Sequence, residues 1–152
     1  MPGTSQEAQI LQRLKDKLTT LTWVKKVETE MIRNLFTDFN EAELPAIQIF
    51  DAAPATIAGA KSLVNVRWPL QIECVLKSTK AHTFDQGEML DKKKAIEDVI
   101  SADLSLLLPA KIPGFINLQY VSFETDLHTT PGFYAIILRF DALYSKEFPG
   151  CG

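Results

Sequence analysis

The sequence has few of the residues from which most metal sites are built. It contains only two cysteines and two histidines in 152 residues. Cys74, Cys151, His82 and His128 form neither a Cys-x-x-Cys nor a His-x-x-x-His spacing, the arrangements typical of zinc ligands. We therefore expect no metal site and no cofactor, and two free thiols of the kind found in a reducing compartment.

Glycine-rich phosphate loops and nucleophile motifs are also missing. The one G-x-G sequence is Gly150-Cys151-Gly152, which no helix follows. Asp126 and His128 stand two residues apart in a segment that more often caps its own backbone than performs catalysis. With no catalytic residue to name, we expect a structural or binding protein. A small α+β enzyme or ligand-binding domain is the alternative, and it would need a concave pocket with convergent polar groups.

Positive charge is too scarce for a typical nucleic-acid-binding protein, and long apolar runs are too scarce for a membrane-spanning one. Lys and Arg number 16 against 19 for Asp and Glu, a net charge of −3, which argues against a protein that mainly binds nucleic-acid phosphates. No run reaches the roughly 18 to 20 apolar residues that cross a bilayer, and the first ten residues do not resemble a signal peptide. We expect a soluble chain made in the cytosol, with residues 1–152 forming one domain.

The first part of the chain carries a clear helical pattern. Apolar residues recur at three- and four-residue steps and predict a helix at about residues 5 to 20. Thr4 and Glu7 have the spacing of a capping box. A β-prone run at 23–27 predicts a strand. Residues 30–38 predict a short helix, and a long loop with buried apolar anchors is the alternative.

Two segments with strand and turn character follow. Residues 44–50 predict a second strand, with Pro45 at its first positions, where no ladder hydrogen bond is needed. Residues 52–62 are small and include Pro54 and Gly59, which indicates a flexible hairpin connection.

The strongest strand signal in the sequence lies at residues 64–76. Apolar residues alternate with mostly polar ones, so one face is apolar over the whole length. At about 3.3 Å per residue this strand would exceed about 40 Å, longer than a domain of this size usually covers. Either part of the hairpin at about 45–77 projects, or Pro69 marks a bulge that bends the strand. We expect the apolar face to exceed what one chain can cover.

The second half predicts one helix and two strands. The helix spans about residues 88–107 and ends before Pro109. Strands follow at about 115–124 and 133–145, joined through Pro131-Gly132. The predicted fold class is α+β, with a mainly antiparallel sheet of four to five strands and two long helices packed on one face. The apolar stripe of the helix predicted at about 88–107 is formed by Met89, Ile96, Ile100, Leu104 and Leu107.

Charged residues are unevenly distributed. Residues 28–51 contain six acidic residues and one basic residue, whereas residues 77–94 contain five basic and three acidic residues. Such opposite charges suit a head-to-tail contact that closes into a ring, and they could equally neutralise each other within one chain. Trp23 and Trp68 are more typical of core or interface positions than of stacking platforms.

The order of elements is similar to that of the tail terminator (tail completion) proteins of long-tailed bacteriophages. The opening helix, the strand at 44–49, the long strand at 64–76, the helix that includes residues 90–100 and the two closing strands carry this resemblance over nearly the whole chain. The resemblance implies a homo-oligomeric ring, a hexamer, at the head-proximal end of the tail tube. The ring ends tube polymerisation and provides the docking surface for the head connector, and no catalytic residues are implied.

The partners implied by this resemblance are further copies of the chain, the tail tube protein and the head–tail connector protein. No membrane contact and no specific nucleic-acid binding are implied, even where the genome passes through the ring. The location would be the virion tail, and the host cytoplasm during assembly. Another connector, neck or tail tube component of similar build is an alternative.

The functional residues of such a protein would lie in strand edges and loops. We expect the hairpin at about 45–77 and the loop at 78–87 to contact neighbouring subunits or the tube. The candidate interface residues are Pro54, Ile57, Lys61, Arg67, Trp68, Lys80, His82 and Phe84.

Overall fold

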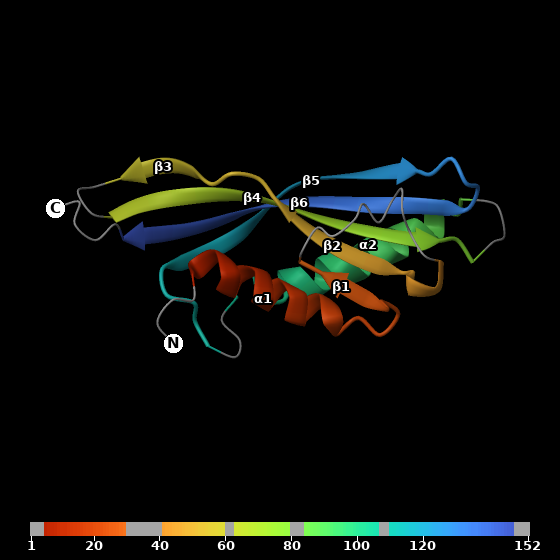
Figure 1. Ribbon diagram of the computed structural model, residues 1–152, viewed down its shortest axis with the longest axis horizontal. Helices are drawn as coiled ribbons and strands as arrows, with labels where there is room; N and C mark the ends of the chain where they lie inside the picture. Colours follow the sequence, from red (N-terminus) through yellow and green to blue (C-terminus); the bar gives the residue numbers. More distant parts are fainter. Residues whose placement is uncertain (1–4, 30–40, 60–62, 80–83, 107–109, 148–152) are drawn as a thin grey trace.

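The computed structural model describes residues 5–29, 41–59, 63–79, 84–106 and 110–147, and the side chains of 57–59 are not among those described. These residues form an α+β fold with two helices and a six-stranded sheet (Figure 1). The elements are α1 (Gln6–Thr19), β1 (Lys26–Glu28), a 3₁₀ turn (Glu41–Glu43), β2 (Ala46–Asp51), β3 (Ala55–Gly59), β4 (Leu63–Lys77), α2 (Gln86–Ser101), β5 (Phe115–Leu127) and β6 (Phe133–Glu147).

The sheet is mixed and has the strand order β1-β2-β4-β6-β5, with β3 also paired to β4. The β1–β2 pair is parallel, and the other four pairings are antiparallel. The prediction of a mainly antiparallel sheet is confirmed, whereas the predicted count of four to five strands is wrong. The extra strand is β3, which lies in a segment without a strand-like pattern.

Strands β4 and β6 form the centre of the sheet. They pair without interruption from Leu63 opposite Glu147 to Lys77 opposite Phe133. Residues 133–138 of β6 are buried on both faces, as expected for a central strand. The long strand predicted at 64–76 is therefore confirmed, and its partner is almost equally long.

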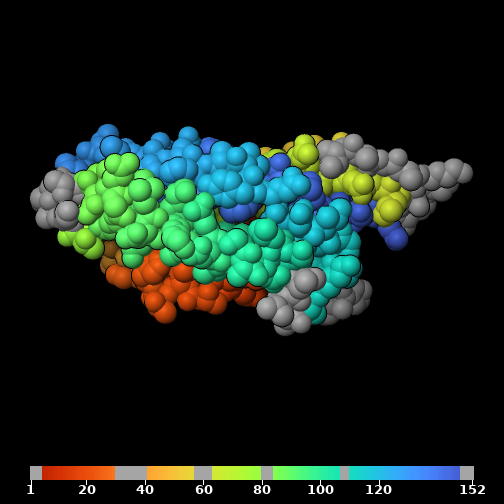
Figure 2. Space-filling view, turned by 180° about the vertical axis from the view of Figure 1, so that it is seen from behind, coloured from red at the N-terminus to blue at the C-terminus, as the bar shows by residue number. Residues whose placement is uncertain are grey.

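Both helices contribute to the same hydrophobic core on one face of the sheet. The buried stripes of α1 and α2 belong to one cluster with the even-numbered residues of β4 and β6. Figure 1 shows the two helices on the same side of the strands, and Figure 2 shows the molecule from the opposite direction. Amphipathic helices bury their apolar stripe in this way because each apolar side chain that is removed from water stabilises the fold.

The apolar face of β4 is covered within one chain. Its even-numbered side chains from Val66 to Leu76 are at most 5% exposed, and Val64 is partly buried. The expectation that this face exceeds what one chain can cover is therefore wrong. The reason lies in α1, whose start reaches the far end of β6: the Gln6 side-chain amide donates to the carbonyl of Ser145 at 2.7 Å.

Pro69 marks a change of neighbouring strand and not a bulge. The pairing of β4 with β6 continues through Pro69 opposite Asp141 without a register shift. On its other side, β4 pairs with β2 from Leu70 onward and with β3 up to Arg67. The Pro69 carbonyl accepts from the Ala52 N–H at 3.0 Å, so the missing proline N–H falls where one partner strand ends and the next has not begun.

The connection expected at 52–62 contains a strand. Residues Ala55–Gly59 pair antiparallel with β4, with a register shift between Thr56 and Ala58. The hairpin of β3 and β4 forms one end of the elongated molecule (Figure 1). Small residues with a proline and a glycine suggested a loop, but the free edge of β4 beyond Pro69 offers backbone groups that a short strand can pair with.

Helix α1 begins one residue later than the capping box predicts. Its N-cap is Ser5, whose hydroxyl accepts from the Ala8 N–H at 3.0 Å, while Thr4 lies outside the described residues. The predicted bond from the Glu7 carboxylate to the Thr4 N–H therefore also lies outside the described residues. The Glu7 carboxylate accepts from the Tyr144 hydroxyl at 3.0 Å, a bond that ties α1 to β6.

Helix α2 is shorter than predicted and ends at Ser101. The carbonyl of Leu104 accepts from β5, and that of Leu106 accepts from Arg13 of α1 at 2.8 Å. These tertiary hydrogen bonds replace the last predicted helical turns. Of the strand predicted at 23–27, only Lys26 and Val27 belong to β1, and the segment 30–38 lies outside the described residues.

Candidate assembly surfaces

The predicted interface residues divide into several groups. Pro54 is exposed just before β3, and Arg67 is exposed on β4, 3.4 Å from Asp141. Trp68 is only 2% exposed, and its indole N–H donates to Asp51 at 3.2 Å. The assignment of Trp68 to an interface is therefore corrected, because a core side chain offers almost no surface to a partner.

The remaining predicted residues are not collected into one site. Phe84 is 36% exposed and packs edge-on against Tyr134, at the end of β6 far from the residues that pair with Arg67. Lys61, Lys80 and His82 lie outside the described residues, as does the side chain of Ile57. Pro54 and Arg67 thus belong to the hairpin end of the molecule, and Phe84 to the other end.

Strand β5 carries the main apolar surface that sequence reasoning missed. It is the last strand of the sheet, so one of its edges has no partner strand in the described part of the chain. Among the described residues, nine large hydrophobic side chains are exposed, and five of them lie on this strand. We call them the β5 edge residues: Ile116, Tyr120, Val121, Phe123 and Leu127. The apolar composition of β5 was visible in the sequence, but its place at the edge was not.

Helix α2 holds β5 in place from one side. The Lys93 ammonium lies 4.3 Å from the centre of the Phe123 ring, and Tyr120 packs edge-on against Phe140 at 5.2 Å. Burial and the neighbouring Glu97 raise the pKa of Tyr120. Figure 2 shows β5 running along α2 at the margin of this face. The edge is therefore supported by packed side chains and does not need to be ordered by a partner.

Two bulges divide β5 into unequal pieces. Register shifts relative to β6 occur between Phe115 and Asn117 and between Tyr120 and Ser122. Residues 122–127 then pair with β6 in regular order. Bulges bend a strand and interrupt its ladder, so residues 122–127 form the longest regular part of this exposed edge.

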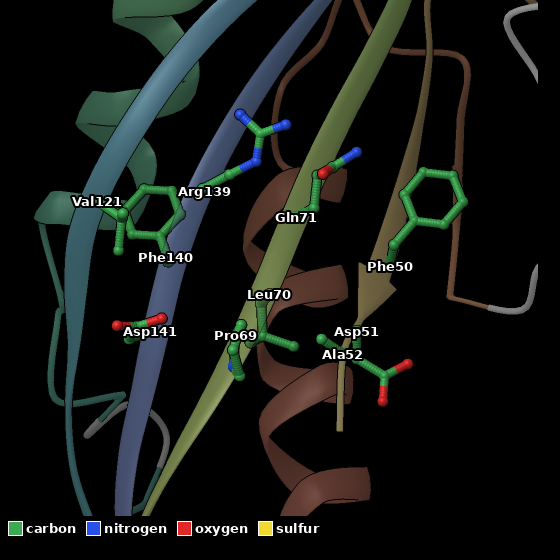
Figure 3. A pocket seen from close by; sticks show the side chains of 10 residues that line it. All are labelled: Phe50, Asp51, Ala52, Pro69, Leu70, Gln71, Val121, Arg139, Phe140 and Asp141. Atoms are coloured by element: carbon green, nitrogen blue, oxygen red, sulfur yellow. The ribbon is translucent and has the colours of Figure 1, made fainter. Parts of the chain in front are cut away.

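A shallow hollow lies on the sheet face opposite the helices. Its volume is about 280 Å³, and in Figure 3 the Gln71 and Arg139 side chains stand on the sheet while α1 lies behind it. Arg139 is bound to Glu124 at 2.7 Å, and Asp141 to Arg67 at 3.4 Å. The hollow is lined by Phe50, Asp51, Ala52, Pro69, Leu70, Gln71, Val121, Arg139, Phe140 and Asp141.

A row of polar side chains crosses the same face nearer to β1. Gln48 is 1% exposed and donates to Glu28 at 3.2 Å. Glu73, opposite Gln48, is 9% exposed, and burial together with the charge of Asp126 raises its pKa. Gln48 and Glu28 are thus bound to each other. The described residues contain no group of three or more His, Cys, Asp or Glu side chains that could hold a metal ion.

The basic residues of segment 77–94 are largely engaged within the chain. Lys77 binds Glu41 at 2.7 Å, and Lys94 binds Asp98 at 2.6 Å. The Lys92 ammonium lies 4.4 Å from the centre of the Trp23 ring. Of the two interpretations of the uneven charge, these contacts favour neutralisation within one chain over attraction between copies.

The potentially reactive side chains have structural positions. Cys74 is a free thiol at the centre of the core, where burial raises its pKa to about 12 and leaves it un-ionised at neutral pH. His128 accepts from the Thr130 N–H at 2.9 Å, as expected for a loop that caps its own backbone. Among the described helices, none is long and apolar enough to cross a membrane.

Comparison with known proteins gives a relationship in fold. No protein-family model matches the sequence, and no curated protein matches it. A chain from a solved structure described as "Virion of native gene transfer agent (GTA) particle" matches with a TM-score of 0.51 and 14% identity. The match covers 94% of this chain and 96% of the other. The two chains therefore share a fold over almost their full lengths.

Proposed function

We propose that this chain is a structural protein of a virion, and that it forms a ring at the head-proximal end of a phage tail tube. The ring ends tube polymerisation and presents the surface on which the head connector docks. The observation that carries this proposal is the fold shared with a virion chain over nearly the whole length of both. The element order of the sequence points independently to tail terminators.

The surfaces of the molecule support a role in assembly more than one in catalysis. Exposed apolar side chains are concentrated along the free edge of β5, a feature that in soluble proteins usually marks an interaction site. The charged groups around the hollow are bound to each other, so they do not converge on an open position for a substrate. The support for a ring thus comes from strand edges, since the apolar face of β4 is already covered.

The experiment that tests this proposal is electron microscopy of particles that contain the protein, combined with light scattering of the purified chain. We expect a discrete ring and density for the chain between tube and head. A location along the tube or in the neck would favour the other virion components. A monomeric chain that is absent from particles would contradict the proposal.

A further inference from the structure

In the described part of the chain, three strands of the sheet have an unpaired edge: β1, β3 and β5. In the described part of the chain, β5 pairs only with β6, and β3 pairs only with β4. Because β3 lies on the β2 side of β4, the free edges of β3 and β5 are on opposite sides of the strand order, and Figure 1 shows the two strands at opposite ends of the elongated molecule. An edge of this kind offers a row of backbone N–H and C=O groups to another strand.

We propose that the β3 edge of one copy pairs with residues 122–127 of β5 in the next copy. This inference rests on the proposed function, because it assigns the contact through which the ring would form. The contact joins two different surfaces, so each copy keeps one free β3 and one free β5 for its neighbours. Contacts of this heterologous type close into rings when the rotation between copies permits.

The two edges are of similar length. Strand β3 has five residues, with a register shift between Thr56 and Ala58, and the regular part of β5 beyond its second bulge has six residues. The bulge at Tyr120 and Ser122 limits pairing toward the start of β5. At the other end of this stretch, Leu127 is 63% exposed, and a neighbouring strand would cover it.

The compositions of the two edges are complementary. Residues 52–67 contain two basic residues and no acidic residue, whereas β5 contains two acidic residues and no basic residue. Strand β3 is rich in small residues, Ala55, Ala58 and Gly59, which allow another backbone to approach closely. Strand β3 itself has no charged residue, so its pairing with β5 brings no like charges together, whereas a contact of β5 with β5 would place the acidic residues of both copies on one interface.

Cysteine cross-linking of the full chain tests the pairing. Thr56→Cys on β3 and Asp126→Cys on β5 are introduced separately and together in a Cys151→Ser background, and the remaining Cys74 is buried. A short bis-maleimide bridging about 10 Å spans neighbouring positions on paired strands. We expect a ladder of covalent oligomers from the double variant and no cross-link from either single variant. Thr56→Cys with Asp91→Cys, at an exposed position of α2, is the matched control and should give no ladder.

The outcomes separate this inference from the ring itself. A double variant that is oligomeric by light scattering but forms no ladder would overturn the pairing and leave the ring proposal intact. Cross-links within one single variant would indicate a two-fold contact and would overturn the heterologous arrangement. A chain that is monomeric at every concentration would overturn both proposals.

A second pair of variants avoids dependence on the introduced cysteines. Leu127→Lys places a charge on the β5 edge, and Leu90→Lys does the same on α2, where Leu90 is 45% exposed. We expect Leu127→Lys to abolish oligomers while its thermal unfolding stays close to that of the parent chain, and Leu90→Lys to leave oligomers unchanged. Equal effects of the two substitutions would contradict a role for this edge.

Discussion

Single residues of this protein are explained by what surrounds them in the fold more than by their type. Trp68 illustrates this, because a tryptophan in a long strand suggests an interface until the helices beneath it are known. In the structure its ring is buried and its N–H is bound to Asp51. The residue therefore stabilises the monomer, and its substitution has a definite consequence.

We predict that Trp68→Phe lowers the free energy of unfolding by about 1–2 kcal/mol, because it removes the hydrogen bond to Asp51 and part of the buried ring. Urea denaturation followed by circular dichroism measures this loss. Arg67→Ala, at the neighbouring exposed position, should change the stability by less than about 0.5 kcal/mol. Equal stability of Trp68→Phe and the parent chain would contradict the core assignment.

Glu73 makes the stability depend on pH. Burial and the charge of Asp126 raise its pKa from the ordinary value of 4.5, so the folded state keeps a proton that the unfolded state has already lost. The contribution of Glu73 to stability must therefore fall as the pH rises from the unfolded pKa through the higher folded pKa. Above that window the folded protein carries a poorly solvated carboxylate.

We predict that Glu73→Gln raises the urea midpoint at pH 7 and reduces the decline of stability above pH 4.5. Denaturation curves between pH 4 and pH 8 measure both effects. Glu147→Gln, at an exposed position at the end of β6, is the control and should leave the pH profile unchanged. If both variants follow the parent profile, burial of Glu73 has no energetic consequence.

At the scale of elements, helices and strands with a regular apolar periodicity could be predicted from the sequence, whereas those in irregular segments could not. The two-residue alternation of β4 and the apolar stretch of β6 were readable because each strand buries at least one whole face. Strand β3 was not readable, since its pairing depends on an edge that β4 supplies. Helix α2 was predicted too long because the spacing of Leu104 fits a helix, while its carbonyl is bound to β5.

The candidate surface was harder to predict than the fold. The apolar residues of β5 could be found in the sequence, but their exposure follows from strand order, which no local pattern records. Whether the unevenly distributed charges neutralise each other also depends on distances in space that the sequence does not show. Lys77 and Glu41 are 36 positions apart in the chain and 2.7 Å apart in space. A charge count assigned them to opposite patches, and only the fold joins them.

Helix α2 depends on its N-cap residue, Asp85, for a defined start. The Asp85 carboxylate accepts from the N–H groups of Gly87 at 3.0 Å and Glu88 at 3.3 Å. We predict that Asp85→Ala lowers the free energy of unfolding by about 1 kcal/mol, because two helix N–H groups lose their partner. Asp85→Asn keeps the acceptor and should retain most of the stability. Thermal unfolding compares the two, and an equal loss in both would contradict the capping role.

For the whole molecule, the decisive property is that its sheet is long and unclosed. Both helices cover one face, and the free edges of β3 and β5 lie at opposite ends of the molecule (Figure 1). The β3 and β5 edges of one copy cannot pair with each other, but each edge can pair with an edge of a neighbouring copy. Because the two edges differ in sequence and in charge, the assembly has a direction, as required for a ring with distinct upper and lower faces.

The same charge difference should make assembly depend on salt. Asp126→Lys brings the net charge of β5 from −2 to zero, so we predict association that is roughly 3- to 10-fold weaker at low ionic strength. Sedimentation velocity at about 50 mM and 500 mM salt measures this, and the difference from the parent chain should shrink at high salt, where charges are screened. Asp91→Lys changes the net charge of the protein equally but lies on α2. If it weakens association as much as Asp126→Lys, overall charge governs assembly, and the β5 edge has no specific part in it.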